Sequence, residues 1–262
     1  MPPILNVANW LLPMLYLGLL IAYGSRFFLR TAQEGVSFIL PFVVAAHAAF
    51  LVSLGYVLGR PVPVNNYEVL SVVAAATAGV YWIIELISRQ RRTGVFVMLA
   101  VFLLQYTSSV FFRCAGETAG HMGQLHILPA IVAYTAFTIS AVYSALHLLA
   151  RRDLKQRRFG VLFDRLPSLD ALGLLNWHAI LIGFIFISVA IVTGATMYAS
   201  GTTHMDAKTL VRIFAGAAAW LIYAGAIIGR LALRWDFTRV SVLSIAGFIV
   251  VAAMLVASIV LS

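Results

Sequence analysis

The stretch HMGQLHILPAIVAYTAFTISAVYSALHLL occupies residues 121–149, and LDALGLLNWHAILIGFIFISVAIVTGATMYASGTTHMD occupies residues 169–206. Each contains an apolar run longer than the roughly 18 residues that indicate a membrane span. An Arg- and Lys-rich segment joins the two runs, and each run bears histidine at the end away from that segment. The pattern predicts two membrane helices whose histidine-bearing ends lie at one membrane face, where they can coordinate something large and apolar.

The composition indicates a membrane protein. Hydrophobic residues make up 62% of the chain and charged residues only 10%, whereas a soluble chain carries roughly 25% charged residues. The formal net charge of +9 would suit a nucleic-acid partner. However, the basic residues stand at the ends of apolar runs, where membrane topology places them. We therefore expect the lipid bilayer as a partner and no nucleic acid.

The apolar runs predict an all-α, polytopic bundle of eight transmembrane helices, because backbone polar groups in lipid must pair within their own segment. The first run has no basic residues before it and no small-residue cleavage site, so we expect a retained span. We treat residues 1–262 as a single transmembrane domain. The expected spans are 8–28, 36–59, 67–88, 93–113, 127–149, 174–199, 208–231 and 239–261.

The distribution of positive charge predicts the orientation. The connections after the first, third, fifth and seventh spans are rich in arginine and lysine, and the alternate connections are poor in both. Cytoplasmic loops carry this excess, so we expect both termini on the outer side of a bacterial-type inner (cytoplasmic) membrane. The basic connection at residues 151–173 also contains apolar residues. It is either an interfacial helix on the inner leaflet or a solvated cytoplasmic loop.

His47 lies near the middle of the second expected span. An ionisable side chain at that depth marks a functional site or a partner inside the bundle. We consider two interpretations: a ligand or proton-handling group, and a histidine that only forms hydrogen bonds between helices. The alanines on either side allow close helix approach, or leave space for a flat ligand.

Histidines also stand at the expected outer ends of the helices. His126 begins the fifth span, and Tyr134 lies two turns further along a face that should point into the bundle. Haem iron is commonly held by imidazole, and an aspartate near a histidine can orient it as a ligand. We therefore expect His126 and His47 to be metal ligands of haem b. The full expected cofactor-binding set is His126, His47, His204 and Asp206.

Other interpretations of these residues remain open. His121 and His204 can equally be ordinary exposed loop residues. A zinc site from His121, His126, His204 and Cys114 lacks the tight ligand spacing of such sites. No Gly-x-Ser-x-Gly, phosphate loop or pair of catalytic carboxylates is present, so we expect no enzymatic activity. Tight helix packing is the expected role of Gly183, Gly194, Gly216, Gly225 and Gly229.

The order of these features resembles the CcsA/CcmC/CcmF-type cytochrome c assembly family over most of the chain. GRPVPVNNYEVLS at residues 59–71 is similar to the family's P-x-x-N-x-Y-E-S segment. LHILPAIVAYTAF at residues 125–137 resembles H-V-x-x-x-x-x-A-Y-x-x-F, whose histidine is an external haem ligand, a role that would fall on His126. Residues 169–195 and 204–237 resemble two further segments of the family.

Two departures make the chain most similar to the smaller YpjD/HemX-like eight-span branch. The loop MYASGTTHMDAKT at residues 197–209 has no tryptophan, where the family has a tryptophan-rich haem cradle. Ile228 stands where a membrane histidine is usual. The resemblance implies a scaffold that handles haem with an incomplete signature, in which His204 is a candidate to replace the cradle.

We derive two functional hypotheses. In the first, the protein binds or handles haem (transfer, export or haem-linked regulation) without covalent catalysis, and its partners are haem-receiving or redox membrane proteins. In the second, the scaffold has lost haem chemistry and is an accessory or anchoring subunit of a larger respiratory or redox membrane complex.

Overall fold

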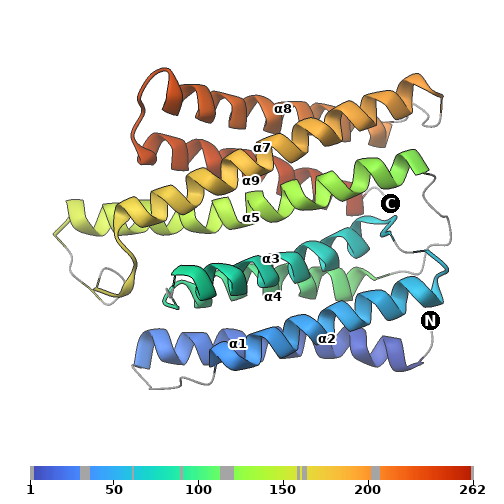
Figure 1. Cartoon of the computed structure of the whole chain (residues 1–262), viewed down its shortest axis with the longest axis horizontal. Helices are drawn as coiled ribbons and strands as arrows, with labels where there is room; N and C mark the ends of the chain where they lie inside the picture. The colour runs from blue at the N-terminus through green and yellow to red at the C-terminus, as the bar shows by residue number, and fades with distance from the viewer. Residues whose placement is uncertain are drawn as a thin grey trace. The chain divides into compact units, whose positions relative to one another are not determined.

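The computed structural model describes residues 3–29, 36–60, 62–88, 91–112, 121–157, 160, 164–201 and 207–260 (Figure 1). Over these ranges the chain forms eight helices, each long and apolar enough to cross a membrane, and no strand. The predicted all-α fold with eight spans is confirmed. The helices are α1 (Pro3–Leu29), α2 (Val36–Val57), α3 (Asn66–Ser88), α4 (Gly94–Phe111), α5 (His121–Lys155), α7 (Leu169–Ala199), α8 (Ala207–Leu231) and α9 (Phe237–Val260).

The helices form two compact units. Unit 1 contains α1 to α4, and unit 2 contains α5, α7, α8 and α9. Each unit has its own buried interior. The expectation of a single transmembrane domain over residues 1–262 therefore stays a prediction.

Unit 1 buries polar side chains along one face of its first helix. Asn9, Tyr16 and Tyr23 of α1 are all buried. They are seven residues apart, close to two helical turns, so they share one face of α1. That helix packs mainly on α4, which in turn packs on α3, while α2 contacts α1 and α3. The interior of unit 1 is therefore partly polar, and its buried groups need partners from neighbouring helices.

Unit 2 is organised around a stacked aromatic pair. The rings of Phe137 in α5 and Tyr223 in α8 are parallel, with centroids 3.8 Å apart. Gly183 of α7 makes room for this pair, because a Cβ at that position would overlap the Phe137 ring. The Tyr223 hydroxyl donates to the Ser244 carbonyl of α9 at 3.2 Å. One aromatic contact thus connects all four helices of unit 2.

The helices on either side of the basic connection extend into it. α5 continues to Lys155, and α7 begins at Leu169 after Ser168, whose hydroxyl accepts a hydrogen bond from the Ala171 amide at 3.3 Å. Both ends of the 151–173 segment are therefore helical. Residues 158–159 and 161–163 lie outside the described part of the chain, so the choice between interfacial helix and loop stays open there.

Unit 2 has two distinct ends. The end at which α5 and α8 begin and α7 ends is called the His121 end, and the opposite one the Lys155 end. At the Lys155 end Arg151 pairs with Asp236 at 2.7 Å, and the Arg230 guanidinium lies 4.0 Å from the centroid of the Phe237 ring. The described basic residues of unit 2 gather at this end, apart from Lys208 and Arg212 near the start of α8.

Candidate functional site

His126 is held in a fixed orientation at the His121 end of unit 2. Its Nδ1 lies 2.8 Å from the Ala190 carbonyl oxygen of α7. A carbonyl only accepts hydrogen bonds, so Nδ1 carries the hydrogen and the lone pair of the neutral ring is on Nε2. Metal-binding histidines usually have this arrangement, with one nitrogen bonded to a backbone carbonyl and the other directed at the metal. The half-buried His126 ring therefore fits an axial ligand of haem iron.

Gly194 brings the His126 ring close to α7. A Cβ at Gly194 would lie 3.2 Å from both Cε1 and Nδ1 of the imidazole, tighter than most contacts of that kind. The ring thus packs against helix backbone one turn beyond its hydrogen-bond acceptor, Ala190. The predicted packing role of Gly194 fits this contact. The structure shows in addition that the side chain packed against Gly194 is His126, the candidate ligand.

His47 has a partner at each ring nitrogen. The ring is fully buried in unit 1, with the Tyr16 hydroxyl 2.9 Å from Nδ1 and the Ser71 hydroxyl 3.0 Å from Nε2. Ser71 uses its own hydrogen to donate to Gln105 Oε1 at 2.9 Å. The Ser71 oxygen therefore accepts a hydrogen bond from Nε2–H of His47. The Tyr16 hydroxyl donates to Nδ1 of the same ring.

The hydrogen bonds of His47 continue through unit 1. Gln105 Nε2 donates to Ser109 Oγ at 3.1 Å, and Ser109 donates to the Asn9 carbonyl oxygen at 2.8 Å. A bond from His47 to iron would require one of its two existing hydrogen bonds to break. The geometry of unit 1 therefore supports the packing interpretation of His47, in which the ring joins α1, α2 and α3.

The remaining expected ligands are not part of the described site. His204, Asp206 and Cys114 lie outside the described residues, as does the side chain of His121. Where side chains are described, no three His, Cys, Asp or Glu residues lie close enough together to hold a metal ion. The roles expected of His204 and Asp206, and the alternative zinc site, stay predictions.

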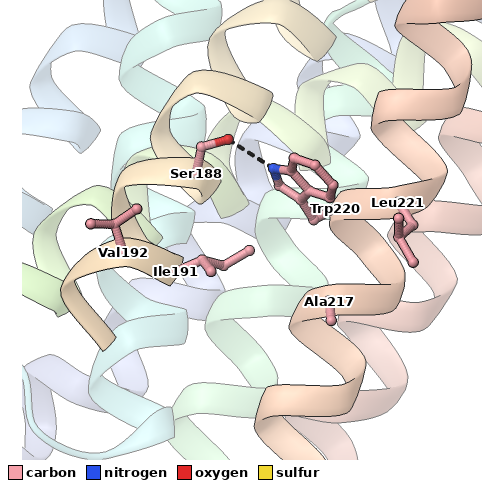
Figure 2. Close-up of a pocket in the computed structure, with 6 residues that line it drawn as sticks. All are labelled: Ser188, Ile191, Val192, Ala217, Trp220 and Leu221. Carbon is pink, nitrogen blue, oxygen red and sulfur yellow. Dashed lines mark hydrogen bonds between the residues drawn. The ribbon is translucent and has the colours of Figure 1, made fainter. Parts of the chain in front are cut away.

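A separate apolar groove of about 430 Å³ lies between α7 and α8 (Figure 2). The Trp220 indole N–H donates to Ser188 Oγ at 2.9 Å, and the Ser188 hydroxyl donates to the Phe184 carbonyl oxygen at 2.7 Å. The polar groups of the groove are thus already paired, and its lining offers no ligand for iron. The lining residues are Ser188, Ile191, Val192, Ala217, Trp220 and Leu221.

Comparisons with known proteins agree with this architecture. Residues 63–260 match the family described as "Cytochrome C assembly protein". A 69-residue stretch is 38% identical to Protein HemX of Brevibacillus brevis, covering 26% of this chain and 25% of that relative. The match to HemX therefore spans about a quarter of the relative's length, and no solved structure matches the chain. Because the family match covers well over half of the sequence, the chain belongs to the cytochrome c assembly protein family.

Proposed function

We propose that this multi-pass membrane protein binds haem b and hands it on during cytochrome c assembly, with His126 as an axial ligand. Membership of the family indicates a role in cytochrome c biogenesis. The observation that carries the haem proposal is the hydrogen bond from His126 Nδ1 to the Ala190 carbonyl. This bond fixes the tautomer and leaves the Nε2 lone pair for a metal.

The chemistry of the site suits binding better than catalysis. Bound haem supplies an iron that takes an axial imidazole. The protein supplies a ring whose orientation is set by α7, so little conformational entropy is lost when the iron binds. His204 and Asp206 are proposed to complete the site from the α7–α8 connection. No covalent change is required of any of these residues.

The orientation in the membrane is part of the proposal. Apart from Arg212, the described basic side chains of unit 2 gather at the Lys155 end, which suits the cytoplasmic side of a bacterial inner membrane. His126 would then lie at the outer side. Release of haem to a receiving membrane protein would take place there.

Haem titration of the purified protein tests the proposal. We expect the wild-type protein in nanodiscs to give a shifted Soret band with haemin, and His126→Ala to lose it. The matched control is His178→Ala, which alters an exposed histidine of α7 and should leave the band unchanged. A wild-type protein without a Soret shift, or a His126→Ala variant with the wild-type spectrum, would overturn the proposal. Co-purification with redox subunits and no cofactor on this chain would then favour the accessory-subunit hypothesis.

A further inference from the structure

The last turns of α1 and α3 and the first turn of α4 lie together at one end of unit 1, which we call the Arg26 end (Figure 1). The Tyr23 hydroxyl of α1 donates to Glu85 Oε2 of α3 at 2.8 Å. The Phe27 ring of α1 lies edge-on to the Phe96 ring of α4, with centroids 5.3 Å apart. Arg26 stands between Tyr23 and Phe27 in α1, so contacts on both sides fix its backbone.

Arg26 is a partly buried cation without an acceptor. Its Nη1 is shielded from solvent and has no hydrogen-bond partner, and the guanidinium forms no ion pair with any described residue. The Glu85 carboxylate at this end already has other partners, because Oε2 accepts from Tyr23 and Oε1 lies 3.6 Å from Arg91 Nε. An arginine keeps its charge in proteins, and a charge that loses hydration without gaining a partner is costly. Arg26 therefore points to an anionic ligand.

The length of α1 places Arg26 at the level of the lipid headgroups. α1 has 27 residues, or about 40 Å of helix, whereas the hydrocarbon core of a bilayer is about 30 Å thick. Arg26 is in the last turn of α1, which ends at Leu29, so it lies where the helix leaves the hydrocarbon. Arg91 and Arg92 precede α4 at the same end. Basic residues at the ends of spans favour the cytoplasmic side.

Large apolar side chains at the Arg26 end are exposed. They belong to the last turns of two helices and are Phe28 and Leu29 of α1, and Leu86 and Ile87 of α3. An exposed apolar surface bordered by polar residues marks a membrane contact in a spanning protein. The Arg26 end thus offers a cation to an anionic group and apolar surface to acyl chains, and a phospholipid contains both. Free phosphate would use only the cation.

We propose that Arg26 binds the phosphate group of an anionic phospholipid in the cytoplasmic leaflet, with the partly exposed Arg91 as a second cation. Guanidinium groups form paired, charge-assisted hydrogen bonds to phosphate oxygens. Basic side chains next to a membrane span also attract lipids with net negative charge. The site lies in unit 1 and is independent of the haem binding proposed for His126 in unit 2.

Native mass spectrometry of the detergent-solubilised protein tests the proposal. Dioleoylphosphatidylglycerol is compared with dioleoylphosphatidylcholine, which has the same acyl chains and no net charge. We expect the first bound lipid to be the anionic one with about tenfold preference, as expected for one charge-assisted hydrogen bond. Arg26→Gln should lose most of this preference, and Arg26→Lys should keep part of it. Arg92→Gln, at an exposed arginine of the same end, is the matched control and should behave as wild type.

Thermal unfolding in detergent adds a second measurement. Arg26→Gln leaves no described group without its partner, so without lipid it should unfold at the wild-type temperature or above. Phosphatidylglycerol should raise the midpoint of the wild type more than that of Arg26→Gln, because a ligand stabilises the state that binds it. Inorganic phosphate should raise neither. A lower midpoint of lipid-free Arg26→Gln, a lipid preference that survives in this variant, or an equal effect of inorganic phosphate would overturn the proposal.

Discussion

His126 Nδ1 lies 2.8 Å from the carbonyl oxygen of Ala190, so a ring carried by α5 takes its orientation from α7. The Thr193 hydroxyl donates to the same carbonyl oxygen at 3.0 Å. The candidate ligand is therefore sensitive to changes in α7 that leave the histidine itself intact.

Gly194→Ala tests this dependence. The added methyl group would lie 3.2 Å from the imidazole, so the ring must move by a few tenths of an ångström. We expect haem affinity to fall several-fold, while the helical circular dichroism signal stays unchanged. Gly225→Ala in α8 is the matched control, because a Cβ there meets no atom within 4 Å. Equal haem affinity in the two variants would show that Gly194 does not position His126.

His47→Leu distinguishes the two interpretations of the buried histidine. If the ring is a packing group, the change removes the acceptor of the Tyr16 hydroxyl and leaves Ser71 only its hydrogen bond to Gln105. The free energy of unfolding should then fall by about 1–3 kcal/mol, since two buried hydrogen bonds are lost. The haem spectrum should stay unchanged. Denaturation in detergent and a haemin titration provide the two measurements, and loss of the Soret band would identify His47 as a ligand instead.

Arg60 and Glu68 form a buried ion pair in unit 1. Arg60 Nη2 lies 2.8 Å from Glu68 Oε1, and each side chain is only 5% exposed. The amide of Glu68 donates to Asn65 Oδ1 at 2.9 Å, so the Asn65 side chain caps the start of α3. Arg60→Ala should lower the free energy of unfolding by about 3–5 kcal/mol, because it leaves a buried charge without its partner.

Arg151→Ala is the control for this measurement. It removes the partner of Asp236 from a pair in which both side chains are about half exposed. Exposed pairs contribute about 1 kcal/mol or less, so the loss should be much smaller than that of Arg60→Ala. Similar losses in the two variants would contradict the assignment of Arg60 and Glu68 as a buried pair.

The ion pair at the Lys155 end should respond to acid. Burial alone would raise the pKa of Asp236, but the Arg239 amide and the Arg151 guanidinium outweigh it and hold that pKa below its usual value. A carboxyl with a lowered pKa stabilises the fold above its unfolded pKa of about 3.9, and this contribution is lost as the pH falls through the lower folded value. The thermal midpoint should therefore fall slightly as the pH drops below about 4.

Asp236→Asn should remove this part of the pH dependence, whereas Asp153→Asn should retain it. The effect is small because Asp236 is half exposed to solvent. Thermal unfolding followed between pH 5 and pH 3 measures it. An identical pH profile in Asp236→Asn and wild type would show that this pair contributes nothing to acid stability.

The sequence indicates several features of the site because they follow from residue type. Histidine and arginine are rare in apolar spans, so His47 and His126 stand out as candidates from the amino-acid sequence alone. The glycines are less informative. Gly183, Gly194 and Gly229 pack closely against rings, as expected, but Gly216 and Gly225 have open space around them. The sequence around a glycine in an apolar helix does not show whether that glycine packs against a ring or lies next to open space.

By itself, the sequence determined the eight spans and the clustering of positive charge at their ends. Bilayer thickness and the cost of unpaired backbone groups in lipid act on each segment separately, so composition and length suffice. Only the tertiary structure decided that His47 is bonded at both nitrogens and that His126 bonds to the Ala190 carbonyl. These relationships depend on the rotation and axial register of one helix against another. The packing of side chains between helices sets this rotation and register. No local pattern in the sequence of an apolar helix specifies that packing.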